Sequence, residues 1–142
     1  MLATHNGHCF CGAIRFEIIP PVKWSVTCHC ESCRRQCAAP MTTYIGLEEG
    51  RWRWIEGNPK TFESSPGVTR EFCGDCGSPL TFSSEKMTGL KHFHVNALDD
   101  PEAFPPERHV SIEEKLCWLH LNDGLPAQEG PEAAPKAELR SS

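Results

Sequence analysis

The segment 27–35 reads TCHCESCRR, so it places three thiols within six positions and two arginines directly behind them. Thiolates held this close together repel one another unless a soft cation neutralises them. Zinc bound by cysteine sulfur at about 2.3 Å is the usual solution. The segment therefore predicts a metal site formed by Cys28, Cys30 and Cys33. Three protein ligands leave a fourth coordination position, and what fills it separates a catalytic zinc from a closed, structural one.

Two further cysteine motifs lie on either side of this segment in the sequence. Residues 9–12 read CFCG and residues 73–77 read CGDCG, with glycines where metal-binding knuckles need tight turns. A strand is expected to lead out of the first motif and another into the second. Four sulfurs could then meet at one tetrahedral ion and close a loop of about sixty residues. We assign to this structural zinc the residues Cys9, Cys11, Cys73 and Cys76.

Nine cysteines in 142 residues would also suit the disulfide framework of a small secreted protein. The odd number, the C-x-C and C-x-x-C spacings and the lack of an export signal in residues 1–7 favour metal instead. The formal charge of -5 and the pI of about 5.8 argue against nucleic acid or a membrane as the main partner. Because no run of about 18 apolar residues is present, we expect a soluble, cytoplasmic protein.

The rest of the chain has the alternating pattern and the turn residues of a mainly β protein. We expect strands at residues 13–19, 22–27, 41–45, 51–56, 60–63, 68–72 and 90–98. The first two should form a hairpin with a thiol motif at each end. Short helices are expected at 34–39, ended by Pro40, and near 101–104. One domain should cover residues 1–126, and the Ala-, Pro- and Glu-rich residues 127–142 should form a disordered tail.

Several side chains have two interpretations each. Trp52 and Trp54 share one strand face, where sheet packing is favoured over a ligand platform. His92 and His94 also share a face, and solvent-facing or hydrogen-bonded histidines are favoured over metal ligands. Cys37 lies four residues after Cys33, so on a helix it could approach the second metal as a fourth thiolate and close the site. We favour the open site, with Cys37 as a small buried side chain.

Taken together, the motifs resemble those of the glutathione-dependent formaldehyde-activating enzyme family, also called the GFA or CENP-V type domain. The resemblance covers most of the chain and rests on residues 7–16, 28–35 and 72–80, with residues 98–101, 115–118 and 123–126 as closing motifs. It implies a β-tent (Mss4-like) fold of twisted antiparallel sheets with two zinc ions per chain. The implied activity is carbon-sulfur lyase chemistry, the interconversion of formaldehyde and glutathione with S-(hydroxymethyl)glutathione.

In such an enzyme the second zinc would bind the glutathione thiol as a thiolate and present it to the aldehyde carbon. Arg34 and Arg35 are placed to bind the carboxylates of glutathione, although surface or structural ion pairs are the alternative. A non-catalytic, zinc-stabilised protein-binding module with the same fold is the alternative function. A zinc ribbon that binds nucleic acid is disfavoured by the net charge. The sequence leaves the oligomeric state open.

Overall fold

The computed structural model describes residues 3–132 and 139–140. This part of the chain is mainly β with a single α-helix, which confirms the predicted fold class. The chain divides into two compact units, residues 1–24 with 45–105 and residues 25–44 with 106–142. The single domain expected over residues 1–126 stays a prediction. The chain passes from one unit to the other within β3 (Trp24–Cys28) and again within β4 (Thr42–Glu48). None of the helices in the described residues has the length and apolar character needed to cross a membrane.

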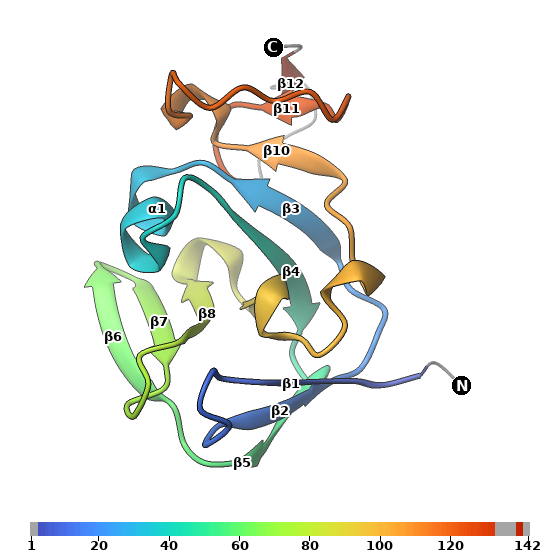
Figure 1. Cartoon of the computed structure of the whole chain (residues 1–142), viewed down its shortest axis with the longest axis vertical. Helices are drawn as coiled ribbons and strands as arrows, with labels where there is room; N and C mark the ends of the chain where they lie inside the picture. The colour runs from blue at the N-terminus through green and yellow to red at the C-terminus, as the bar shows by residue number, and fades with distance from the viewer. Residues whose placement is uncertain (1–2, 133–138, 141–142) are drawn as a thin grey trace. The chain divides into compact units, whose positions relative to one another are not determined.

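The first unit contains two sets of antiparallel strands, drawn in Figure 1. The first set has the order β1-β2-β5, with β1 (His5–His8), β2 (Arg15–Ile18) and β5 (Trp52–Glu56). In the second set each strand pairs with the next: β6 (Lys60–Ser65), β7 (Val68–Phe72), β8 (Pro79–Ser84) and β9 (Leu90–His94). Three short 3₁₀ helices complete the unit: Glu85–Met87, Val95–Ala97 and Pro101–Ala103.

Aromatic rings form much of the core of the first unit. The alternation of β2 buries Phe16 completely, and its ring centroid lies 5.0 Å from that of Phe93 and 5.7 Å from that of Trp54. Trp52 also packs against this core, so the prediction of sheet packing for the tryptophan pair is confirmed. Gly7 allows β1 to approach closely, because a Cβ atom there would collide with the ring of Phe16.

The histidine pair of β9 is buried rather than solvent-facing. His92 has no exposed surface, its Nε2 accepts a hydrogen bond from Trp24 Nε1 at 2.9 Å, and its ring stacks on Phe82 with centroids 4.5 Å apart. His94 is 6% exposed. For His92 the hydrogen-bonded interpretation is therefore confirmed and the solvent-facing one is wrong. An imidazole that makes such contacts is stabilised inside a sheet without a metal.

The strands of the second unit lie side by side in Figure 1, in the order β12-β11-β10-β3. The strand β10 (Arg108–Val110) runs parallel to β3 and to β11 (Ala127–Gln128), and β12 (Leu139–Arg140) is antiparallel to β11. The predicted hairpin of residues 13–19 and 22–27 is wrong, because β2 pairs with β1 and β5 while β3 pairs with β10. Pro20 and Pro21 have no N–H to donate, so they end the ladder instead of turning it back.

Part of the segment that was predicted as a disordered tail is ordered. Ala127 and Gln128 are 2% exposed each, and the Gln128 side chain accepts a hydrogen bond from Arg108 and donates one to Pro131 O. Arg108 also donates to the carbonyl of Glu132 at 2.8 Å. Composition did not reveal this because these polar groups are buried through hydrogen bonds rather than apolar contact. Residues 133–138 and 141–142 of the predicted tail lie outside the described residues.

The α-helix α1 (Glu31–Cys37) begins three residues before the predicted start. Cys30 has an extended backbone, and its sulfur accepts a hydrogen bond from the N–H of Cys33 at 3.3 Å, so it acts as the N-cap. At the other end Ala38 adopts the left-handed conformation with φ of 51°, which ends the helix two residues before Pro40. Because Cys30 is the N-cap, the helix begins inside the thiol segment, directly after the second of its three cysteines.

Candidate metal centres

The first unit brings together the four thiols predicted to share a structural zinc. The sulfurs of Cys9, Cys11, Cys73 and Cys76 all lie within 4.8 Å of one another. The sulfur of Cys11 is 3.6 Å from that of Cys9 and 3.8 Å from that of Cys73, although 62 residues separate Cys11 from Cys73. Four converging thiols, two of them almost fully buried in the core, are the ligand set of a closed structural zinc site.

The two motifs that supply these thiols have the same backbone design. Gly12 donates to Cys9 O at 3.0 Å and Gly77 donates to Cys73 O at 2.9 Å, and both glycines have a positive φ, +82° and +79°. In each motif a backbone N–H also points at the first sulfur, from Ile14 to Cys9 and from Asp75 to Cys73. At Cys9 the hydrogen bond from Ile14 helps to lower the pKa of the thiol, because a hydrogen bond to a charged group stabilises it. The glycine turns predicted from the sequence are confirmed.

The hydroxyl of Ser78 adds to this effect at the fourth thiol. It lies 3.1 Å from the sulfur of Cys76 and, with backbone hydrogen bonds, lowers the pKa of that thiol to about 5. The same hydroxyl accepts a hydrogen bond from the N–H of Phe10, a residue of the other motif. The residues of the first cluster therefore fit a divalent, thiophilic ion.

The second unit brings together the thiols of Cys28, Cys30 and Cys33, whose sulfurs also lie within 4.8 Å of one another. Cys28 ends β3, Cys30 caps α1 and Cys33 lies in its first turn. The neighbouring thiols, followed by burial, raise the pKa of Cys28 well above its ordinary value. Three such thiols cannot all ionise without a cation, so the donor set fits a metal ion. Among the described residues, no fourth Cys, His, Asp or Glu joins this group.

Cys37 lies four positions after Cys33 on α1, as predicted, and is half-buried. It is not a member of the group whose sulfurs lie within 4.8 Å. The arrangement supports the interpretation in which three thiols leave one coordination position open.

Tyr44 contacts the second cluster, and sequence reasoning did not single it out. It is 1% exposed, and its hydroxyl donates to the sulfur of Cys33 at 3.4 Å. Such a bond stabilises Cys33 as a thiolate and holds it in place. Tyr44 is the only tyrosine of the chain, yet no spacing rule connects a strand residue with a thiol eleven positions earlier.

Sequence reasoning also missed a buried chain of hydrogen bonds that begins at the residue between Cys28 and Cys30. His29 Nε2 lies 2.9 Å from His109 Nδ1, and His109 Nε2 lies 2.8 Å from Asp123 Oδ2. Burial, followed by the charge of His109, lowers the pKa of His29 to about 4. The N–H of Leu125, with the ring of His109, holds the pKa of Asp123 below its usual range.

The two arginines behind the thiols both make contacts within the second unit. Arg34 donates from Nε to His29 O at 3.1 Å and from a terminal nitrogen to Glu114 O at 3.3 Å. Arg35 forms an ion pair with Glu31, one helical turn before it, at 2.7 Å. Both arginines therefore make structural contacts, which is the alternative to glutathione binding given above for Arg34 and Arg35.

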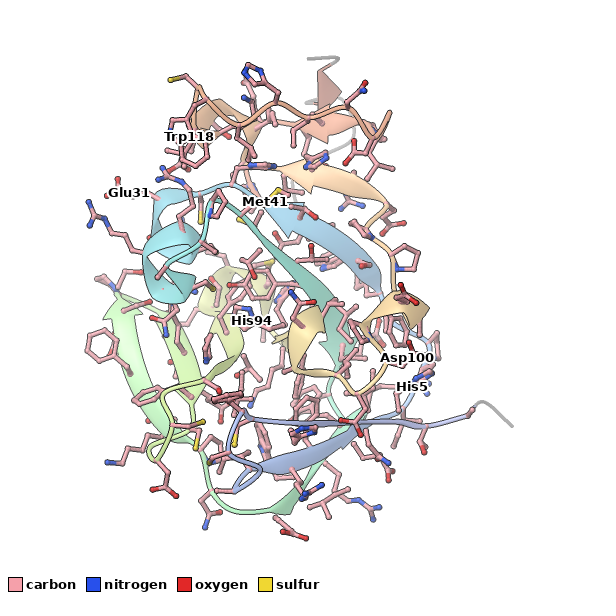
Figure 2. The ribbon with its side chains drawn as sticks, viewed as in Figure 1. His5, Glu31, Met41, His94, Asp100 and Trp118 are labelled. Carbon is pink, nitrogen blue, oxygen red and sulfur yellow. The ribbon has the colours of Figure 1, made fainter. Side chains whose placement is uncertain are left out.

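Arg34 and Arg35 also line an open pocket of about 440 Å³. Pro40, Leu116 and Trp118 form its apolar part. The Trp118 side chain, labelled in Figure 2, is 62% exposed. Two guanidinium groups beside an exposed aromatic ring suit a ligand that carries both carboxylates and apolar or peptide groups.

Comparison with known proteins places the chain in a family. The sequence profile described as "Glutathione-dependent formaldehyde-activating enzyme" matches residues 4–114. A Halomonas elongata protein assigned by name to these enzymes is 30% identical over 129 residues, covering 82% of this chain and 80% of its own. A Schizosaccharomyces pombe protein described as an uncharacterized lyase is 30% identical over 116 residues, with the same coverage.

Among solved structures, a Rhodobacter sphaeroides protein has a similar fold, with a TM-score of 0.56 and 20% identity. The match covers 66% of this chain and 87% of that one. The residues matched by the family profile include all three thiols of the second cluster and all four of the first, from Cys9 to Cys76. The chain therefore belongs to the glutathione-dependent formaldehyde-activating enzyme family.

Proposed function

We propose that the protein is a zinc-dependent carbon-sulfur lyase that acts on a glutathione-type thiol and a small aldehyde, as an S-(hydroxymethyl)glutathione synthase does. The observation that carries this proposal is the second cluster, in which three thiols converge without a fourth ligand among the described residues. Membership of the family supports glutathione and formaldehyde as the substrate pair. The finer assignments, a β-tent fold and a cytoplasmic location, stay predictions.

In this proposal each cluster holds one zinc ion. Cys9, Cys11, Cys73 and Cys76 hold the structural ion. Cys28, Cys30 and Cys33 hold the second, which when bound would supply a Lewis acid that favours the thiolate form of a thiol substrate. Tyr44 donates to the sulfur of Cys33 and so limits the charge that this ligand places on the site.

The reaction itself balances without a further reactant. The thiol sulfur adds to the carbonyl carbon and forms the C–S bond, and the carbonyl π electrons move to the oxygen. That oxygen then takes up the proton that the thiol has lost. Arg34 and Arg35 would bind the carboxylates of glutathione, because a guanidinium has five N–H groups and the observed contacts of Arg34 use two of them.

The proposal is tested by exchange NMR with ¹³C-labelled formaldehyde and glutathione, which measures formation and breakdown of the hydroxymethyl adduct against the spontaneous rate. The zinc-loaded protein should accelerate both directions equally. A protein that holds two zinc ions but leaves the exchange rate unchanged would refute the lyase and favour the non-catalytic binding module.

The Arg35→Ala variant is expected to weaken glutathione binding by about 1 kcal/mol, roughly fivefold, because Arg35 is exposed and its contribution is screened by water. Calorimetry measures the affinity. The control ligand is a simple thiol without carboxylates, whose affinity should not change. An equal loss for both ligands would show that Arg35 does not bind a carboxylate.

The Cys37→Ser variant is expected to keep the zinc affinity of the second cluster, since Cys37 lies outside the sulfur group. Zinc release to a chromophoric chelator measures this affinity. A large loss of the second zinc would instead identify Cys37 as a fourth ligand and close the site.

A further inference from the structure

The buried chain formed by Asp123, His109 and His29 has no part in the function proposed above. His29 is completely buried and His109 is 2% exposed, whereas the Asp123 side chain is 45% exposed. The chain therefore runs from the surface of the second unit to the residue that separates Cys28 from Cys30. Its members come from positions 80 and 14 residues apart, so only the fold brings them together.

The carboxylate fixes the direction of every hydrogen bond in this chain. Asp123 Oδ1 accepts from the N–H of Leu125 at 3.1 Å, and Oδ2 accepts from His109 Nε2. His109 Nδ1 then carries the lone pair and accepts from His29 Nε2. The reverse direction would bury an N–H at His29 Nδ1, an atom with no hydrogen-bond partner among the described residues, and a buried unpaired N–H is costly.

His29 is held at its backbone as well as at its ring. Its N–H donates to Val110 O at 3.2 Å, and its carbonyl accepts from Arg34 Nε at 3.1 Å. Successive side chains of an extended segment point to opposite sides. Holding the ring of His29 on one side therefore fixes the direction in which its two neighbours, Cys28 and Cys30, project on the other.

We propose that Asp123 and His109 are positioning residues for the second cluster: through His29 they keep the thiols of Cys28 and Cys30 converged for a metal ion. This inference rests on the proposed function only in that the second cluster holds zinc. It assigns a role in metal binding to Asp123, a surface residue that is 95 positions beyond Cys28 in the sequence. Partners that orient the residues of a metal site typically change its affinity by about 10- to 100-fold.

The test is zinc release from the full-length protein to a chromophoric chelator, resolved into a step for each cluster. Asp123→Asn and His109→Phe should each weaken the second-cluster step by about tenfold and leave the first-cluster step unchanged. Asp123→Asn is less disruptive to folding than His109→Phe, because the Asp123 side chain is partly exposed. Its amide has one acceptor oxygen, so it cannot accept hydrogen bonds from both Leu125 N–H and His109 Nε2. His120→Phe, at an exposed histidine of the same unit, is the matched control and should release zinc as the wild type does.

Unchanged second-cluster affinity in the Asp123 and His109 variants would overturn the inference, as would an equal weakening of both clusters, which indicates general destabilisation. If the wild type itself holds only one zinc, the proposed function fails and this inference fails with it. Two-bond ¹H–¹⁵N correlation spectra give an independent reading: both histidines should carry their proton on Nε2. A proton on His29 Nδ1 would contradict the direction of the chain.

Discussion

A Cys73→Ser variant is expected to be unfolded at room temperature. Cys73 is 1% exposed, belongs to the hydrophobic core of the first unit and joins a sulfur group that links residues 62 positions apart. A structural zinc of this kind contributes an apparent free energy of about 10 to 16 kcal/mol, while a whole domain is stable by only about 5 to 15 kcal/mol. Circular dichroism and the zinc content of the purified protein measure the result.

Cys117→Ser is the matched control for this experiment. Cys117 is exposed and belongs to neither sulfur group, so its replacement should leave the folded protein and both zinc ions in place. A Cys73→Ser protein with a cooperative thermal transition close to that of Cys117→Ser would show that the first cluster is not needed for folding.

Cys30→Ser is expected to abolish thiol-dependent activity and to remove one of two zinc ions without unfolding the protein. All ligands of the second cluster lie within residues 28–33, so the loss of this metal releases no long loop. Serine is also a good N-cap, so the hydroxyl can take over the hydrogen bond that the sulfur of Cys30 accepts from Cys33 N. The change in unfolding free energy beyond loss of the metal should stay within about 1 kcal/mol.

Zinc quantification, a thermal melt and the ¹³C exchange assay together measure this outcome. Unfolding of Cys30→Ser, as expected for Cys73→Ser, would assign the second cluster a structural role as well. Retention of full activity with one zinc would remove the second cluster from the reaction altogether.

The thiol groups could be predicted from the sequence because their geometry is largely local. The spacing of Cys9 to Gly12 and of Cys73 to Gly77 sets a tight turn that aims two sulfurs at one point, and only the joining of the two motifs depends on the fold. The segment from Cys28 to Cys33 is local throughout. Alternation likewise predicted the strand at residues 13–19, of which β2 covers Arg15–Ile18.

The partners of the second cluster could not be predicted, since nothing local connects them. His109 reaches His29 because β10 lies parallel to β3, a pairing that the alternation of either strand cannot specify. The predicted hairpin failed for the same reason, because strand patterns define faces but not neighbours. Asp123 belongs to the closing motif at residues 123–126, but that motif does not indicate a contact with His109. The contact depends on the path of the chain between β10 and β11.

The order in which the thiols leave the ribosome follows from the positions of the two clusters. Synthesis releases Cys9 and Cys11 first, and all three thiols of the second cluster emerge long before Cys73 and Cys76. For an interval the nascent chain therefore presents half of the first cluster beside a complete second one. If a metal ion captured in that interval is shared between thiols that the finished fold assigns to different units, its ligands must exchange once residue 76 has been made.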